Sequence, residues 1–127
     1  MTVVAAESLR FVDLPGRRAA DPLSELDTSS SARVVRLEHT PGRRAHRHPL
    51  SEEVYYVVAG SGTVWIDGIS SAVAPGDVVR IPRGAPHATV PAPGTSMHLV
   101  CFFPHPKLEV NTEETGIIVN PTEEDGP

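Results

Sequence analysis

Short runs of residues that favour extended backbone recur along the middle of the chain, and each run is closed by glycine, proline or aspartate. The runs are rich in valine, isoleucine, tyrosine and threonine, and turn residues recur roughly every 8–12 positions. No helical periodicity separates them, so the spacing predicts an all-β sandwich or barrel. We expect strands at residues 34–39, 45–48, 54–59, 62–66, 71–73, 78–81, 87–90 and 97–103.

Turn and proline positions agree with these strands. Asp67 and Gly68 lie between apolar residues and predict a tight hairpin turn. Pro75 and Pro82 flank the run at 78–81 rather than interrupt it, and the ends of a strand are where a sheet tolerates proline.

The length of 127 residues fits one domain of ordinary size. We divide it into an N-terminal arm at 1–32, a β-barrel at 33–104 and a C-terminal extension at 105–127. The arm is weakly patterned, with one short strand expected at 9–14. The extension is expected to leave the barrel, and residues 117–119 to pack on its outside or on a neighbouring subunit.

The net charge of −5 is a property of the C-terminal end, because residues 109–127 carry six acids and no base. Such an acidic tail is usually solvated. The rest of the chain is close to neutral and shows no electrostatic footprint for nucleic acid. We therefore expect no nucleic-acid partner.

The compartment follows from what the chain lacks. Cys101 is the single cysteine, so an internal disulfide is impossible. An acid interrupts the first residues before an apolar signal segment develops. No apolar run approaches the roughly 18 residues of a membrane helix. We expect a cytoplasmic protein with no membrane partner.

Histidine is the most informative residue type, with six in the chain. His46 and His48 have the spacing of two side chains on one face of a strand. Glu53 and Gly60 follow them at the start and end of the next predicted strand. Further along, Gly76, Pro82, Gly84 and His87 form a second group at defined spacing.

With these residues the chain closely resembles the cupin superfamily over residues 33–104. The first family motif corresponds to Gly42, His46, His48, Glu53 and Gly60, although three residues separate Gly42 from His46 where the family usually has about five. In the second motif, Gly76 to His87, the family spacing is kept, and Pro91 stands where the family often has asparagine.

The resemblance implies that the metal ligands are His46, His48, Glu53 and His87. Glu52 is the alternative to Glu53, but only Glu53 has the family's six-residue spacing to Gly60. Three imidazoles and one carboxylate suit one divalent transition metal per chain: Fe, Mn, Ni, Co, Cu or Zn. Four protein ligands on a six-coordinate ion leave two positions open for chemistry.

Three further residues are candidates for the pocket. His39 and His98 lie on predicted strands near the motifs, and each lines the pocket or faces outward according to the strand direction. Tyr55 follows Glu53 into the barrel by the two-residue period, as a pocket hydroxyl or as ordinary core. Tyr56 and Val58 are then expected to face outward.

Arginines cluster beside the first motif and are suited to capture of a carboxylate or phosphate, or form a solvated face. Arg47 alternates away from its histidine neighbours and is expected to point away from the site. Cys101 is expected to be a small buried apolar residue. The other arginines of this cluster are Arg33, Arg36, Arg43 and Arg44.

We predict a mononuclear metal-dependent enzyme that acts on a small organic molecule, with an O2-dependent oxygenase as the first choice. The alternatives are a non-redox isomerase, cyclase or lyase, a non-catalytic binder of sugars or metabolites, and a barrel in which the metal is only structural. By family resemblance we also expect a homodimer, with the N-terminal arm adding a strand to the partner.

Overall fold

The computed structural model describes residues 2–14 and 16–120. Within them, helical backbone is limited to two 3-10 turns, η1 (Ala6–Ser8) and η2 (Leu108–Val110), and no helix is long and apolar enough to cross a membrane. The strands are β1 (Val12–Leu14), β2 (Arg17–Ala20), β3 (Ser31–Glu38), β4 (Arg43–Arg47), β5 (Glu53–Ala59), β6 (Gly62–Ile66), β7 (Ile69–Val73), β8 (Val78–Ile81), β9 (His87–Pro91), β10 (Ser96–Phe103) and β11 (Glu113–Val119).

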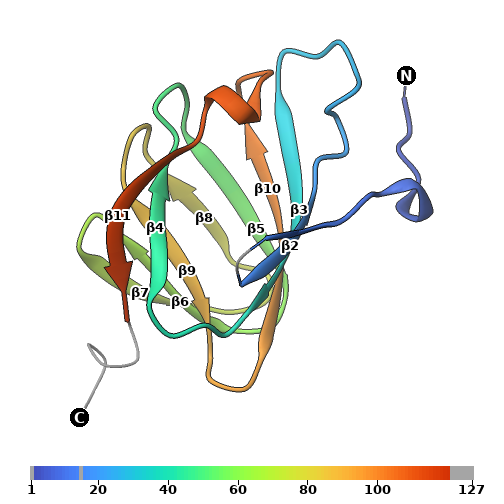
Figure 1. Ribbon diagram of the computed structural model, residues 1–127. Helices are drawn as coiled ribbons and strands as arrows, with labels where there is room; N and C mark the ends of the chain where they lie inside the picture. The colour runs from blue at the N-terminus through green and yellow to red at the C-terminus, as the bar shows by residue number, and fades with distance from the viewer. Residues whose placement is uncertain (1, 15, 121–127) are drawn as a thin grey trace.

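These strands form two antiparallel sheets that face each other and enclose the interior (Figure 1). One sheet has the strand order β1-β2-β3-β10-β5-β8, and the other has the order β11-β4-β9-β6-β7. The all-β prediction is confirmed. All eight predicted runs form strands, β3 to β10, with bounds that differ by three residues at most.

The hairpin predicted at Asp67-Gly68 joins β6 to β7, where Ile66 pairs with Ile69. Both turn residues have positive φ, 47° for Asp67 and 92° for Gly68. A two-residue turn of this kind matches the right-handed twist of the flanking strands, which is the reason that Asp-Gly is favoured here.

Two strands were not predicted: β11 lies at a sheet edge, and β2 lies between β1 and β3. β2 has the sequence Arg-Arg-Ala-Ala, which has little intrinsic strand preference, and it forms because it pairs with β3. β11 pairs with β4, so the expectation that residues 105–127 leave the barrel is wrong for residues 113–119. Covering an open edge satisfies backbone groups that local sequence does not report. Part of the predicted acidic tail, residues 121–127, lies outside the described residues.

The N-terminal arm joins its own chain's sheet. The strand expected at 9–14 is β1, which is shorter than predicted and pairs with β2. β2 in turn pairs with β3 along four residues, from Arg17 opposite Leu37 to Ala20 opposite Val34. The edge of β3 is therefore covered from within the same chain, and the predicted donation of an arm strand to a partner stays a prediction.

Alternation along β5 agrees with the predicted faces. Tyr55 and Val57 are buried between the sheets, whereas Tyr56 and Val58 are 49% and 50% exposed. Burial of one large apolar side chain contributes about 1.5–3 kcal/mol, so the inner faces supply most of the stabilisation. The largest buried apolar side chains of this core are Leu37, Tyr55, Ile81, Met97, Leu99, Phe103 and Leu108.

The outer face of the six-stranded sheet carries exposed apolar side chains on three adjacent strands. Val100 of β10 pairs with Tyr56 of β5, which pairs with Val78 of β8, and all three are exposed. Contiguous apolar surface of this kind often marks an interaction site. The predicted homodimer stays a prediction, because the structure contains a single chain.

The turn between β5 and β6 requires glycine. Gly60 has φ +80°, and a Cβ there would lie 2.1 Å from the backbone oxygen of Ser96. Gly94 has a similar φ, +74°, but a Cβ there would meet no atom within 4 Å. Alanine would therefore strain the left-handed backbone at either position, and only at position 60 would its Cβ also clash with β10.

We predict that Gly60→Ala destabilises the fold far more than Gly94→Ala. The left-handed backbone costs about 1–2 kcal/mol at either position. The clash with Ser96 adds roughly 1–3 kcal/mol at position 60, because a backbone atom has to move. Urea unfolding of both variants measures the difference, and equal midpoints would contradict the close approach of β5 and β10.

Candidate metal centre

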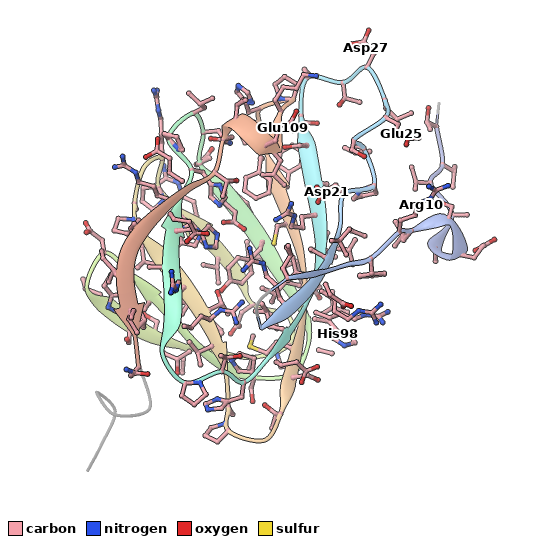
Figure 2. All side chains as sticks on the ribbon, in the orientation of Figure 1. Arg10, Asp21, Glu25, Asp27, His98 and Glu109 are labelled. Carbon is pink, nitrogen blue, oxygen red and sulfur yellow. The ribbon has the colours of Figure 1, made fainter. Side chains whose placement is uncertain are left out.

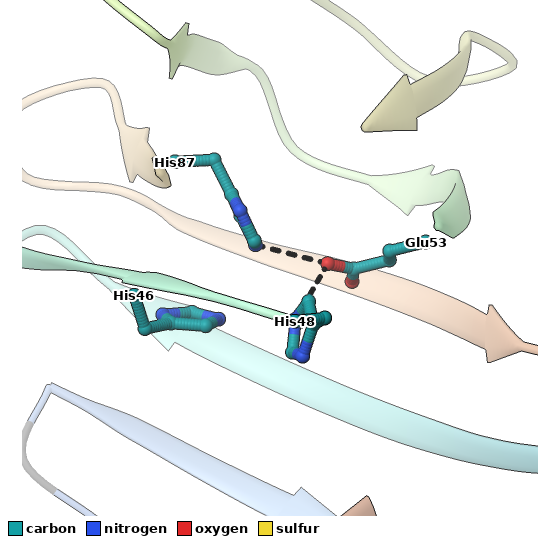
Figure 3. Close-up of side chains that lie close together, drawn as sticks. All are labelled: His46, His48, Glu53 and His87. Atoms are coloured by element: carbon teal, nitrogen blue, oxygen red, sulfur yellow. Dashed lines mark ion pairs between the residues drawn. The ribbon is translucent and has the colours of Figure 1, made fainter. Parts of the chain in front are cut away.

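Two paired strands and the first residue of a strand in the opposite sheet bring the four predicted ligands together. His46 on β4 pairs directly with His87, the first residue of β9. His48 follows the end of β4, and Glu53 opens β5 in the opposite sheet. One ligand atom from each of the four residues lies within 4.8 Å of the others. Figure 3 shows the four side chains converging from these elements.

The carboxylate of Glu53 lies between two imidazoles. Its Oε1 is 3.1 Å from Nε2 of His48 and 3.0 Å from Nε2 of His87, the two contacts that are dashed in Figure 3. The ring centroid of His46 is 4.5 Å from that of His87. Glu53 is 5% exposed and His87 3% exposed, so these side chains lie in the interior, whereas His46 is partly exposed.

Hydrogen bonds to backbone carbonyls fix the orientation of two imidazoles. Nδ1 of His48 lies 2.7 Å from the carbonyl oxygen of Asn111, and Nδ1 of His87 lies 3.0 Å from that of Ala85. A carbonyl only accepts, so each Nδ1 carries the proton and donates it. In the neutral ring Nε2 then keeps its lone pair, which is the usual arrangement of metal-binding histidines.

The atoms that point at one another have no hydrogen-bond partner among the described residues. They are Nε2 of His48, Nε2 of His87 and Oε1 of Glu53, all buried. Buried polar atoms are rarely left without a partner. Two lone pairs and a carboxylate oxygen that meet without a donor between them fit a cation. The residues present therefore fit a divalent transition metal.

Electrostatics keeps the group ready to bind a cation. Burial opposes ionisation of Glu53, but the adjacent imidazoles of His48 and His87 outweigh it and hold the pKa of this carboxyl below its usual range. Burial lowers the pKa of His46 well below its usual value, and His87 lowers it further. Both residues thus favour the metal-binding form, an ionised carboxylate and a neutral imidazole.

The structure separates the two neighbouring glutamates. Glu53 lies in the buried cluster, whereas the carboxylate of Glu52 lies on the surface, 2.7 Å from Nε of Arg80. This arrangement follows from the alternation of a strand that begins at residue 53, because adjacent side chains leave on opposite faces.

The four ligands line a cavity, and Tyr55, which the sequence left open as a pocket hydroxyl or as core, lines it too. Its hydroxyl is 2.9 Å from Oγ1 of Thr89 and is buried. Burial raises its pKa, so the side chain is a neutral phenol. Cys101 also lines the cavity, and burial raises the pKa of its thiol, with the carboxylate of Glu53 adding to the effect.

The other two pocket candidates do not line this cavity. His98 faces outward because its neighbours Met97 and Leu99 are the inward residues of β10, and Figure 2 shows it at the margin of the molecule. His39 follows β3, and its Nδ1 is 2.8 Å from the carbonyl oxygen of Pro91. The expectation that they lie in the pocket is therefore not met, since strand direction turns His98 away and a backbone carbonyl holds His39.

Asn111 is a supporting residue that the sequence did not reveal. It is fully buried, and its carbonyl oxygen accepts from His48. Its side-chain oxygen accepts from the backbone N–H of Leu50 at 2.8 Å, and its amide donates to Ser51 at 2.8 Å. It thereby fixes the segment that joins His48 to Glu53. Only the folded chain brings residue 111 beside residue 50, so no local pattern signals it.

The cavity also contains arginines. Arg33 and Arg43, from the cluster beside the first motif, line it, together with Arg17, which the sequence did not single out. Arg47 lies on the surface and pairs with Glu113 at 2.7 Å, in agreement with its predicted orientation away from the site.

Comparison with known proteins places these findings in a wider group. A family model described as a cupin domain matches residues 33–103. The curated protein MJ1618 of Methanocaldococcus jannaschii, itself uncharacterized, is 31% identical over 68 residues, and the match covers 54% of each chain. The match thus spans about half the length of that relative.

Solved structures with the same architecture have diverse reactions. A Streptomyces PAC13 variant with uridine has a TM-score of 0.78 at 18% identity, over 97% of this chain and 96% of that chain. Pac13 is described as a nucleoside dehydratase. A variant of salicylate 1,2-dioxygenase from Pseudoaminobacter salicylatoxidans has a TM-score of 0.67 at 21% identity, over 81% of this chain and 32% of that chain. At such identities the likeness concerns the fold.

We predict that the purified protein holds about one transition metal ion per chain and that His87→Ala loses it. The three remaining ligands bind the metal more weakly. Loss of a residue that only hydrogen-bonds to a ligand already lowers metal affinity about 10–100-fold. Elemental analysis after dialysis measures the occupancy. His98→Ala is the matched control and should keep its metal; full occupancy in His87→Ala would remove the site.

Metal affinity should also fall with pH. Protons compete with the metal for imidazole lone pairs, so affinity is complete above the usual imidazole pKa of about 6.5 and is lost as the pH falls below it. Because its pKa is lowered, His46 stays neutral and able to bind the metal at a lower pH than an exposed histidine would. Chelator competition between about pH 5 and 7.5 tests this, and constant affinity over that range is incompatible with imidazole ligation.

Proposed function

Because the chain belongs to the cupin family, with the family model covering residues 33–103, we propose that it is a mononuclear metal-dependent enzyme that acts on a small organic substrate and consumes O2. The observation that supports a metal enzyme is the buried convergence of three imidazoles and one carboxylate at the cavity. The donor set leaves coordination positions for other oxygen ligands. The bound metal would supply activation of substrate oxygens and of O2.

The choice of an oxygenase rests on what the rest of the cavity lacks. Apart from the four metal ligands, the ionisable side chains that line it are three arginines, Tyr55 and Cys101. Burial raises the pKa of both Tyr55 and Cys101, so each holds its proton at neutral pH. Among the described residues that line the cavity, none is a free general base. Chemistry that does not depend on proton abstraction by a side chain is favoured.

The chain's own residues would orient the substrate and exclude water. Val35, Leu37, Leu99 and Phe103 form apolar walls around the donor atoms. Phe103 lies against His48, with ring centroids 4.7 Å apart, and restricts the rotation of that imidazole. Tyr55 holds a proton on Oη and shares it with Thr89 or with a substrate oxygen. A water-poor cavity strengthens each of these polar contacts.

A second candidate is a non-redox elimination or isomerisation. The observation in its favour is the likeness to PAC13 over nearly the whole of both chains, together with a neutral phenol at Tyr55 that is placed to act as an acid. In that reaction Tyr55, which keeps its proton at neutral pH, would give a proton to a departing oxygen.

The two candidates differ in their need for O2. Fe(II)-loaded protein is incubated with a panel of small hydroxy and keto acids, and O2 uptake and products are measured. We expect turnover with O2 consumption in the Fe(II) protein and none in the Zn(II) protein or in Fe(II)-treated His87→Ala. Turnover without O2, or with Zn(II), supports elimination or isomerisation instead.

Tyr55→Phe adds a second discriminator. Loss of a general acid lowers kcat about 100-fold or more, so a large loss with retained metal favours elimination, whereas an oxygenase should keep most of its rate. If metabolites bind but are not turned over under any of these conditions, the result would support a non-catalytic metabolite-binding protein.

A further inference from the structure

Three strands deliver guanidinium groups to the cavity that holds the metal ligands. Arg17 comes from β2, Arg33 from β3 and Arg43 from β4. The charge of Arg33 is compensated, because its Nε and Nη2 lie 2.7 and 3.0 Å from the two carboxylate oxygens of Asp21. This fork-to-carboxylate geometry is the strong form of an arginine ion pair.

Arg17 and Arg43 have no such compensation. Neither forms an ion pair with any residue at 2–14 or 16–120. Arg43 is only 9% exposed, and its one side-chain hydrogen bond in that part of the chain is a long contact of 3.4 Å to the carbonyl oxygen of Gly16. The charge of Glu114, an exposed residue of β11, raises the pKa of Arg17, but the two side chains form no ion pair.

Each of the two guanidinium groups also has its charge disfavoured by burial and by a neighbouring arginine. Burial, with a smaller contribution from Arg17, lowers the pKa of Arg43 to about 10, which leaves it charged at neutral pH. Burial likewise lowers the pKa of Arg17, and the charge of Arg33 adds to the effect. Placing like charges together in a buried site is unfavourable unless an anion compensates them.

We propose that Arg17 and Arg43 bind the carboxylate of an organic-acid substrate whose other oxygen function reaches the four metal ligands. The inference rests on the proposed function and names its substrate class. A carboxylate is planar and accepts paired N–H donors from a guanidinium. An organic acid with a second oxygen supplies both the anion for the arginines and a donor for the metal, and both groups of residues line one cavity.

Arg17 and Arg43 would also determine which substrates the protein accepts. An uncharged analogue leaves the buried Arg43 and the half-buried Arg17 without an anionic partner, and a site built for a polar group discriminates strongly against ligands that lack it. Because Arg33 is already neutralised by Asp21, the discrimination should depend on Arg17 and Arg43.

The test is calorimetric titration of the Zn(II)-loaded protein with carboxylic acids from lactate to salicylate, each beside its uncharged amide. We expect at least one acid to bind about 10-fold or more tightly than its amide. Arg17→Gln and Arg43→Gln should each lose that preference while keeping their zinc. Arg44→Gln is the matched control, since Arg44 is the exposed neighbour of Arg43 on β4 and does not line the cavity.

Several results would overturn the assignment. They are equal binding of acids and amides, no binding of any acid, an equal loss in Arg44→Gln, and a preference for inorganic phosphate over every carboxylate. Arg17→Gln and Arg43→Gln are both tested in case one of them misfolds. The zinc content of each variant shows whether its metal centre is intact. Zinc does not react with O2, so the result is independent of whether the reaction is an oxygenation, and loss of zinc from the unmodified protein would instead mark failure of the metal centre.

Discussion

Two imidazole nitrogens and a carboxylate oxygen meet inside the barrel at separations of 3.0 and 3.1 Å, with no hydrogen-bond donor between them. Such a meeting is unfavourable for the protein alone, because the same buried atoms in water would each have a partner. The arrangement persists because the fold fixes the side chains by other contacts, such as the hydrogen bonds of His48 and His87 to backbone carbonyls. A cation removes the penalty, so the fold and the proposed metal centre are coupled.

The support behind the ligands comes from segments far apart in the sequence. The carbonyl of Asn111 orients His48, and its side chain fixes the turn at Leu50 and Ser51 that leads to Glu53. Asn111 immediately precedes the segment that continues into β11, and β11 pairs with β4, the strand of His46. The C-terminal segment therefore positions the first motif from two sides.

The cavity contains more positive than negative side chains. The ligand cluster contributes one carboxylate, Asp21 cancels Arg33, and the charges of Arg17 and Arg43 are left uncompensated by ion pairs within the described residues. A divalent ion adds further positive charge. Both halves of the cavity thus favour an anionic, oxygen-rich molecule, and the apolar walls between them reduce competition from water. Substrate selection and metal chemistry would act on the same bound molecule.

The local sequence determined the strands β3 to β10, because two-residue alternation and turn chemistry depend on near neighbours. The residues proposed as ligands followed from the resemblance of two local motifs to the cupin family. The local sequence left open the direction of His39 and His98, and it did not reveal β2, β11, Asn111 or Arg17. Those depend on pairing between segments that are distant along the chain: Arg17 reaches the cavity only because β2 pairs with β3. Tertiary structure decided them because edge pairing and burial are set by which surfaces meet, and no short stretch of sequence contains both surfaces.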